Sequence, residues 1–159
     1  VIYKQERAGE NGKPFDVLKL RTMIDGADQM DPQPERDPFE GMVIKIHNDP
    51  RVTRVGRHLR RWSIDEIPQF WNVLRGDMSL VGPRPEQTWV VAQYDDKQRR
   101  RLAVKPGLTG PMQVSGRAEL DMQARQLLEV EYIDTYSIWK DIKLLFQTIP
   151  AVINGDGAM

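Results

Sequence analysis

The sequence contains no cysteine, which excludes a disulfide framework and any thiolate nucleophile or metal ligand. It has no net charge, because 23 basic residues balance 23 acidic ones, so no global field draws it to nucleic acid. No apolar run approaches the roughly 20 residues that span a bilayer, and no signal peptide is recognisable. With 159 residues, we expect residues 1–159 to form a single domain, long enough to bury a real core.

The N-terminal part of the chain has the pattern of a β-hairpin. Residues 1–3 and 15–20 favour strands, and Asn11-Gly12 between them is a strong signal for a tight turn. Because the chain begins inside this pattern without an initiator methionine, we expect it to be a piece of a longer protein. Residues 25–41 are rich in Asp, Pro, Gly and Glu and predict a mobile acidic loop.

The rest of the chain predicts helices separated by loops. A helix is expected to open at Asp49-Pro50, with Asp49 as N-cap, and a second to run from near Asp65 to Gly76. The buried face of the first helix is predicted to comprise Val52, Val55, Leu59 and Trp62. Further helices are expected at 86–102, 120–135 and 138–149, with Gly/Pro-rich loops at 77–85 and 105–116. The predicted fold is α+β, mainly α, without βαβ alternation or a Rossmann unit.

The last predicted helix is amphipathic. Its broad apolar side comprises Ile138, Trp139, Ile142, Leu145, Phe146 and Ile149. A helix of this kind either packs against a core or lies along a membrane surface, with Trp139 and Lys140 at the interface. Both interpretations are open from the residues alone.

Two adjacent carboxylates, Asp65 and Glu66, form the most informative feature of the chain. Acidic residues in a first helical turn complement the helix dipole, and Ser63-x-x-Glu66 fits a capping box, so a purely structural role is one interpretation. The other is catalysis on a phosphate. A diphosphate repels an attacking carboxylate by roughly 4 kcal/mol per charge pair at ~4 Å and an effective dielectric of ~20. Such a site therefore needs cations.

The sequence places cations on both sides of the carboxylates. Arg60 precedes Asp65 by five residues. Arg84 lies between two prolines, which stiffen its backbone and fix the direction of its guanidinium, an arrangement that suits binding of a phosphate. Lys19, at the end of the second hairpin strand, could add positive charge. The arginines of residues 51–61 are otherwise typical of a solvated helix face. Together with the arginines at 99–101 they also suit a non-catalytic module that binds nucleic acid or anionic lipid. Binding of that kind should be unaffected by replacement of Asp65 and should weaken with salt.

Four segments resemble, in order, the motifs of the bacterial sugar transferases, the monotopic polyprenyl-phosphate phosphoglycosyl transferases. They are Phe15–Met23, Asp49–Gly56, Ser63–Glu86 and Val104–Arg117. The resemblance implies transfer of a sugar 1-phosphate from a UDP-sugar to undecaprenyl phosphate with release of UMP, a first membrane step of exopolysaccharide synthesis. It also implies a location at the cytoplasmic face of the bacterial inner membrane, and no nucleic-acid partner. The family carries a hydrophobic re-entrant helix before the hairpin, of which this sequence contains nothing.

The same resemblance assigns roles to individual residues. Asp65 matches the nucleophile that forms a covalent aspartyl-phosphosugar, and Glu66 matches the ligand of magnesium (Mg²⁺), with Asp65 beside it. Lys19, Arg60 and Arg84 match phosphate-binding residues. We further hypothesise that neighbouring arginines depress the pKa of Asp65 and keep it ionised. Glucose, galactose and N-acetylated sugars stay equally open as the transferred group.

Overall fold

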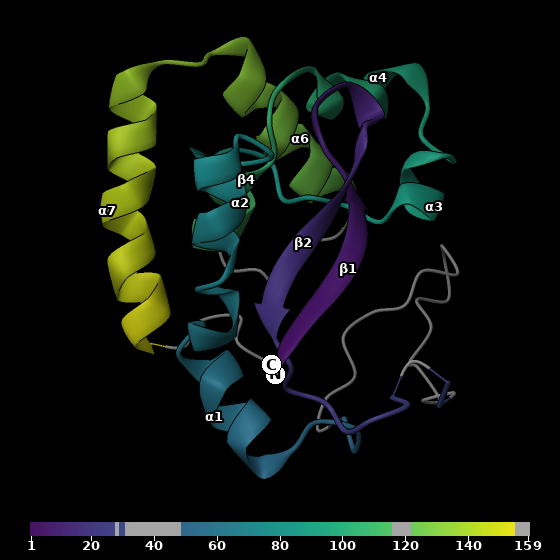
Figure 1. The fold of residues 1–159 in the computed structure, drawn as a ribbon. Helices are drawn as coiled ribbons and strands as arrows, with labels where there is room; N and C mark the ends of the chain where they lie inside the picture. The colour runs from purple at the N-terminus through teal and green to yellow at the C-terminus, as the bar shows by residue number, and fades with distance from the viewer. Residues whose placement is uncertain (28, 31–48, 116–121, 155–159) are drawn as a thin grey trace.

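The N-terminal segment forms the predicted β-hairpin (Figure 1). The computed structural model describes residues 1–27, 29–30, 49–115 and 122–154. Strand β1 (Ile2–Ala8) pairs antiparallel with β2 (Pro14–Leu20). Asn11 and Gly12 have φ of 56° and 74°, the positive values that a tight hairpin turn requires. The hairpin is therefore confirmed, with a longer first strand than predicted. The expected acidic loop falls mostly on positions 28 and 31–41, outside the described residues.

Helices dominate the described part of the chain, which confirms the α+β class with mainly helical content. They are α1 (Arg54–Arg61), α2 (Gln69–Arg75), α3 (Thr88–Val91), α4 (Asp96–Arg99), α5 (Pro111–Val114), α6 (Met122–Asp134) and α7 (Ile138–Asn154). Short 3-10 helices lie at Glu10–Gly12, Ile64–Glu66 and Arg100–Ala103. The helix expected at 86–102 is thus divided into three short pieces, whereas the last two helices are confirmed and α7 continues through Pro150.

A second, small sheet joins the two Gly/Pro-rich loops. Strand β3 (Ser79–Val81) pairs in parallel with β4 (Gly107–Thr109), a pairing that the sequence did not predict because each strand has only three residues. A Cβ on Gly107 would lie 2.1 Å from the backbone nitrogen of Gly82, so the two chains approach too closely for any side chain at this crossing. This approach fixes the start of the loop that carries Arg84.

The first predicted helix begins later than expected. Thr53, and not Asp49, is the N-cap of α1, and its hydroxyl accepts the Gly56 N–H at 2.9 Å. Asp49 is buried and instead accepts hydrogen bonds from the backbone and guanidinium of Arg51, which turn the chain before the helix. The predicted apolar face of this helix is wrong for Val55 and Trp62, which are 68 % and 46 % exposed, whereas Val52 and Leu59 are half-buried. The buried residue of α1 is Gly56.

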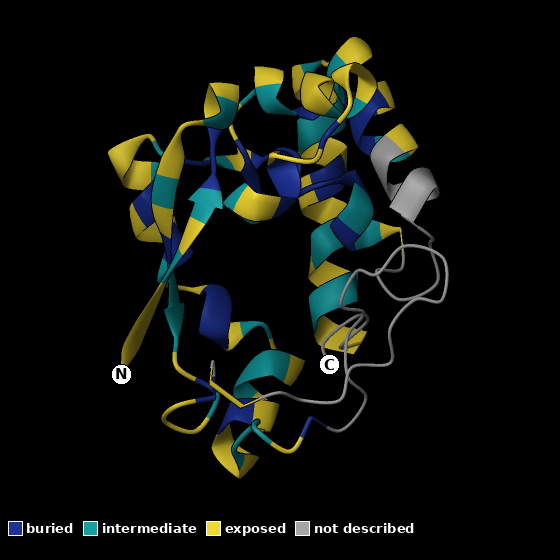
Figure 2. Cartoon of the chain, turned by 90° about the vertical axis from the view of Figure 1, so that its right-hand side faces the viewer, coloured by how far each residue is buried: buried dark blue, intermediate teal, exposed yellow. Residues whose placement is uncertain are grey.

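Buried segments lie in several separate elements of the chain (Figure 2), and within its described part the buried apolar side chains form two small clusters. One joins the hairpin to α3 through Ala8, Val90, Val91 and Tyr94. The other joins β3 to α6 and α7 through Val81, Tyr132 and Leu144. The first cluster anchors the hairpin that carries Lys19, and the second anchors β3, which precedes the loop of Arg84.

Gly56 brings α1 against the end of the hairpin. A Cβ at this position would lie 2.0 Å from the backbone oxygen of Thr22, and the Thr22 hydroxyl accepts a hydrogen bond from Arg60 Nε at 2.9 Å. We expect Gly56→Ala to destabilise the protein by about 1–3 kcal/mol, the usual effect of overpacking, and to displace Arg60. Thermal unfolding measures the first effect. Val55→Ala, on the exposed side of the same helix, is the control and should change stability by less than about 0.5 kcal/mol; an equal effect of both variants would contradict the account.

Candidate active site

Asp65 and Glu66 are buried, with 8 % and 9 % of their surface exposed. They lie on the 3-10 turn Ile64–Glu66, and α2 begins only at Gln69, after Pro68. Ser63 makes no side-chain cap hydrogen bond, so the capping-box interpretation is wrong. Ser63 also adopts a left-handed φ of 53°, a costly conformation for a residue with a side chain that often accompanies functional sites. Buried carboxylates on a strained turn need a different explanation from helix capping.

Glu66 is held by two cations from distant parts of the chain. Lys19 Nζ, near the end of β2, lies 3.2 Å from Glu66 Oε1, and Arg84 Nη2 lies 2.8 Å from the same oxygen. Burial and the nearby Arg84 lower the pKa of Lys19, whereas Glu66 raises the pKa of Arg84. The structure therefore brings three of the predicted site residues into direct contact.

Arg60 approaches the site from α1. Its guanidinium donates to the hydroxyl of Thr22, and it is close enough to Asp65 to favour the ionised carboxylate. The other arginines of α1, at positions 54, 57 and 61, are exposed, as expected for a solvated helix face. Arg60 is thus the member of the run in α1 that turns toward the carboxylates.

The environment of Asp65 raises its pKa, contrary to the hypothesis made from the sequence. Burial is the largest cause and the neighbouring charge of Glu66 adds to it, while Lys19 and Arg60 lower the pKa by less. The sequence hypothesis gave the arginines the largest effect on this pKa, because a sequence shows which residues are charged but not how deeply they are buried. Asp65 is consequently a carboxylate that is destabilised when ionised and therefore more basic than an exposed aspartate.

Comparison with known proteins now decides the family. A model of the bacterial sugar transferase family matches residues 1–155. The chain belongs to this family. In this bacterial sugar transferase domain, Glu66 pairs with Lys19 and Arg84, and all three residues lie in the segments that resemble motifs of the family.

Individual relatives match this sugar transferase domain over 99 % of its length. The galactosyl transferase CpsE of Streptococcus agalactiae is 43 % identical, and an undecaprenyl-phosphate galactose phosphotransferase of Salmonella typhimurium is 41 % identical. A UDP-glucose:undecaprenyl-phosphate glucose-1-phosphate transferase of Caulobacter vibrioides is 42 % identical. The chain spans 35 %, 34 % and 58 % of the lengths of these relatives, respectively.

Asn72 and Thr22 also build the site, and sequence reasoning missed both. Asn72, 1 % exposed on α2, accepts the Leu18 N–H at 3.0 Å and donates to the Asp16 carbonyl at 2.8 Å, which fixes β2 and its Lys19 beside the carboxylates. A polar residue with low helix propensity among the apolar positions of α2 was the available signal. Thr22 carried no signal, because its role depends on tertiary contact with Arg60.

The donor set of the site suits a hard divalent cation that is completed by substrate. In the described part of the chain, no group of three or more His, Cys, Asp or Glu residues could hold a metal by itself. Magnesium is commonly held by one or two carboxylates together with substrate phosphates and water. Asp65 and Glu66 supply carboxylates of this kind, so they fit the ion in the presence of a phosphate substrate.

The raised pKa of Asp65 leads to a prediction about stability. A carboxyl whose pKa is higher in the folded than in the unfolded state binds more protons when folded, so its ionisation lowers stability as pH rises between the two pKa values. We expect Asp65→Asn to raise the melting temperature at neutral pH, with the gain shrinking as pH falls below the folded-state pKa. Thermal unfolding from pH 4 to 8 measures this. A melting temperature lowered at neutral pH would mean that the cations around Asp65 outweigh its burial.

Proposed function

We propose that this domain transfers a sugar 1-phosphate from a UDP-sugar to undecaprenyl phosphate, with release of UMP. The observation that carries the proposal is the buried Asp65–Glu66 pair, which Lys19, Arg60 and Arg84 surround from three separate segments. Burying charged groups costs free energy that their ion pairs often do not recover, so stability alone does not explain this cluster and a functional role does. Names of relatives that specify undecaprenyl-phosphate galactose and glucose phosphotransfer agree with this chemistry.

The proposed reaction has two displacements at one phosphorus. A carboxylate oxygen of Asp65 forms a bond to the phosphorus nearest the sugar, and the bond from that phosphorus to the bridging oxygen breaks, so that UMP leaves with the electron pair. The phosphate oxygen of undecaprenyl phosphate then attacks the aspartyl-phosphosugar, and the Asp65–phosphorus bond breaks. Asp65 returns to its ionised form, and the products are UMP and undecaprenyl-diphospho-sugar. Covalent catalysis of this kind divides one difficult step between two anions into two easier ones.

The cations of the site act on the substrate in both steps. Arg84 and Lys19 both pair with Glu66. In the proposed reaction the two cations also bind the incoming diphosphate. Arg60 favours the ionised state of Asp65, which burial opposes. Magnesium held by Glu66 and Asp65 would supply charge neutralisation for the phosphates and the departing UMP. The raised pKa of Asp65 makes its carboxylate a stronger nucleophile once ionised.

We also propose that the domain works at a membrane surface, at the cytoplasmic face where nucleotide sugars are available. Exposed large apolar side chains lie on α2, on the turn just before it, and on α7. They are Ile67, Phe70, Trp71, Leu74, Ile138, Trp139, Ile142, Leu145, Phe146, Ile149 and Ile153. Apolar exposure on this scale is unusual for a surface in contact with water alone, and a lipid acceptor suits it. Among the described residues, no helix has both the length and the apolar character to cross a bilayer.

The function is tested with the full-length protein in lipid vesicles that contain undecaprenyl phosphate and magnesium. Each of several UDP-sugars, labelled in the sugar, is supplied in turn, and the label that moves into the organic phase is measured together with UMP. The proposal expects both products in equal amounts with at least one sugar. No lipid-linked sugar with any donor, and no UMP, would overturn it and favour the alternative of a module that only binds anionic lipid or nucleic acid.

The membrane proposal makes its own prediction for α7. Trp139 and Phe146 are 76 % and 69 % exposed, and burying each in lipid is worth about 1.5–3 kcal/mol. We expect Trp139→Glu with Phe146→Glu to weaken binding of the 159-residue chain to anionic phospholipid vesicles by at least about tenfold in a flotation assay. Gln147→Glu adds charge at another exposed position of the same helix and is the control. Unchanged binding of the double variant would place the membrane contact elsewhere.

A further inference from the structure

A buried ion pair lies directly behind the loop that carries Arg84. Arg101, in the 3-10 helix Arg100–Ala103, and Glu129, in α6, are 6 % and 1 % exposed, and Arg101 Nη2 lies 2.8 Å from Glu129 Oε2. The sequence alone grouped Arg101 with the arginines of a charged surface, whereas the structure buries it. The pair therefore belongs to a layer beneath the candidate site.

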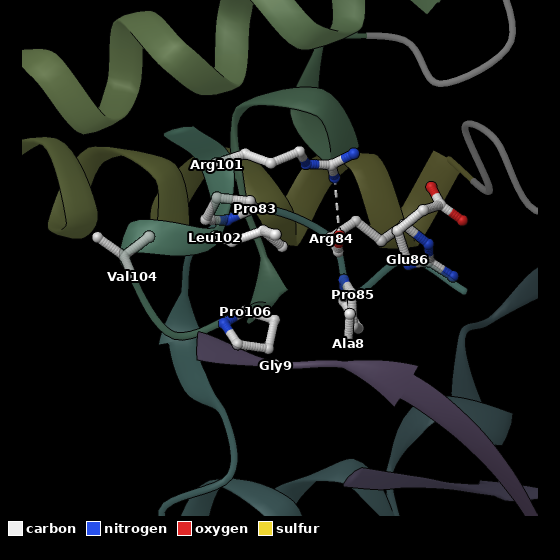
Figure 3. Close-up of a pocket in the computed structure, with 10 residues that line it drawn as sticks. All are labelled: Ala8, Gly9, Pro83, Arg84, Pro85, Glu86, Arg101, Leu102, Val104 and Pro106. Atoms are coloured by element: carbon white, nitrogen blue, oxygen red, sulfur yellow. Dashed lines mark hydrogen bonds between the residues drawn. The ribbon is translucent and has the colours of Figure 1, made fainter. Parts of the chain in front are cut away.

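Both members of the pair hold the backbone of Arg84. The Arg84 N–H donates to Glu129 Oε1 at 3.0 Å. Arg101 Nη2 donates to the Arg84 carbonyl oxygen at 2.9 Å, the bond drawn as a dashed line in Figure 3. Pro83 and Pro85 restrict the backbone on either side and have no N–H of their own. The two opposite charges thus fix the N–H and the carbonyl oxygen of Arg84. The Arg84 guanidinium in turn lies 2.8 Å from Glu66.

The pair is itself tied to the core of the hairpin. Arg101 Nη1 donates to the Tyr94 hydroxyl at 2.5 Å, and its guanidinium lies 5.6 Å from the centre of the Tyr94 ring. Tyr94 packs in the cluster that contains Ala8, and the Ala8 N–H donates to the Glu86 carbonyl at 2.8 Å, two residues after Arg84. The backbone around Arg84 is therefore held by contacts to the cluster that contains Ala8 and Tyr94.

Stability alone does not account for this arrangement. Desolvating two charges costs several kcal/mol per ion, and well-packed apolar residues in their place are often as stable or more stable. A buried pair that satisfies the backbone of a stiff loop does, however, hold an arginine in one orientation. Preorganised charge of this kind is most valuable where negative charge develops or enters.

We infer that Glu129 and Arg101 are positioning residues that hold Arg84 in the orientation needed to receive a phosphate group of the substrate. The inference rests on the proposed function. It assigns them no contact with substrate, because both are buried beneath the loop and act through the Arg84 backbone.

A double-mutant cycle in the full-length protein tests the inference. Glu129→Leu combined with Arg101→Met replaces the ion pair by apolar side chains and should leave the protein folded, with a melting temperature near that of the wild type. We expect kcat/KM for sugar-phosphate transfer to fall by about 10- to 100-fold. In an Arg84→Ala background the same two replacements should cause little further loss, because their effect passes through Arg84. The control for a purely structural effect is Tyr132→Phe in α6, which removes the hydrogen bond that the Tyr132 hydroxyl donates to Asp141 at 2.6 Å. This variant should leave kcat/KM unchanged.

Two results would overturn the inference: wild-type kcat/KM in the folded double variant, or an equal further loss in the Arg84→Ala background. If the double variant does not fold, Glu129→Gln carries the same cycle, because it keeps the volume and removes the charge. Amide hydrogen exchange at Arg84 is measured in parallel and needs no activity. Slow exchange in the wild type that becomes fast in Glu129→Gln supports the clamp, and equally fast exchange in both overturns it. Absence of transfer by the wild type would overturn the proposed function instead, and the exchange result would still stand.

Discussion

Asp65→Asn is expected to abolish sugar-phosphate transfer, with a loss of roughly 10⁴-fold or more in kcat, as for nucleophiles in other covalent enzymes. The amide has almost the volume of the carboxylate but cannot attack phosphorus. The lost group is one whose ionised form the fold disfavours, because burial raises the pKa of Asp65. Loss of activity should therefore accompany a gain in stability at neutral pH. A variant that had lost activity by misfolding would behave in the opposite way.

The comparison for this variant is Asp96→Asn, which replaces an exposed aspartate in the first turn of α4. We expect transfer by Asp96→Asn to equal that of the wild type. The rates are measured as UMP released and as sugar carried into the lipid phase. Transfer by Asp65→Asn within tenfold of the wild type would mean that another group attacks the phosphorus, and the proposed covalent step would be wrong.

Arg84→Ala is expected to lower kcat/KM by about 10²–10³, the usual effect of removing one preorganised group that stabilises developing charge. The substrate phosphate would lose its contact with the Arg84 guanidinium. Glu66 would lose its ion pair with Arg84 at 2.8 Å and keep the one with Lys19. Arg84→Lys should recover only part of the loss, because an ammonium cannot make the paired hydrogen bonds of a guanidinium to a phosphate. Steady-state kinetics with varied UDP-sugar separates the expected rise in KM from the fall in kcat.

The matched control is Arg75→Ala, which removes a largely exposed arginine that pairs with Asp77. Screened surface pairs contribute little, so activity should not change and stability should fall by less than about 1 kcal/mol. If Arg84→Ala and Arg75→Ala had the same activity, the guanidinium of Arg84 would have no part in the reaction, and the proposed phosphate contact would be excluded.

The parts of the fold that depend on local sequence were predictable. Asn11-Gly12 indicates the hairpin because few other pairs accept positive φ at both positions, and Gly76 ends α2 with a φ of 83° for the same reason. The helices α6 and α7 follow from their length and periodicity. The start of α1 was not predictable, since Asp49 and Thr53 are both suitable N-caps and only the pairing of Asp49 with Arg51 excludes the first.

The charged residues that meet at the candidate site were predictable, but its electrostatics and the supporting residues Asn72 and Thr22 were not. Motif resemblance selected Lys19, Glu66 and Arg84, and the structure places them in contact. The raised pKa of Asp65 depends on burial, which no spacing of charges in the sequence indicates. Glu129 was not singled out for the same reason: its importance comes from what lies above it in the fold.

The mass of the intact full-length protein, after incubation with magnesium and a UDP-sugar, tests the central claim most directly. The account predicts a mass gain equal to one phosphosugar with the correct donor, absent in Asp65→Asn, and lost from the wild type when undecaprenyl phosphate is added. Lipid-linked sugar formed without any such adduct, at times short enough to catch a first turnover, would contradict the account. Transfer would then occur by direct attack of the lipid phosphate, and Asp65 would not be the nucleophile.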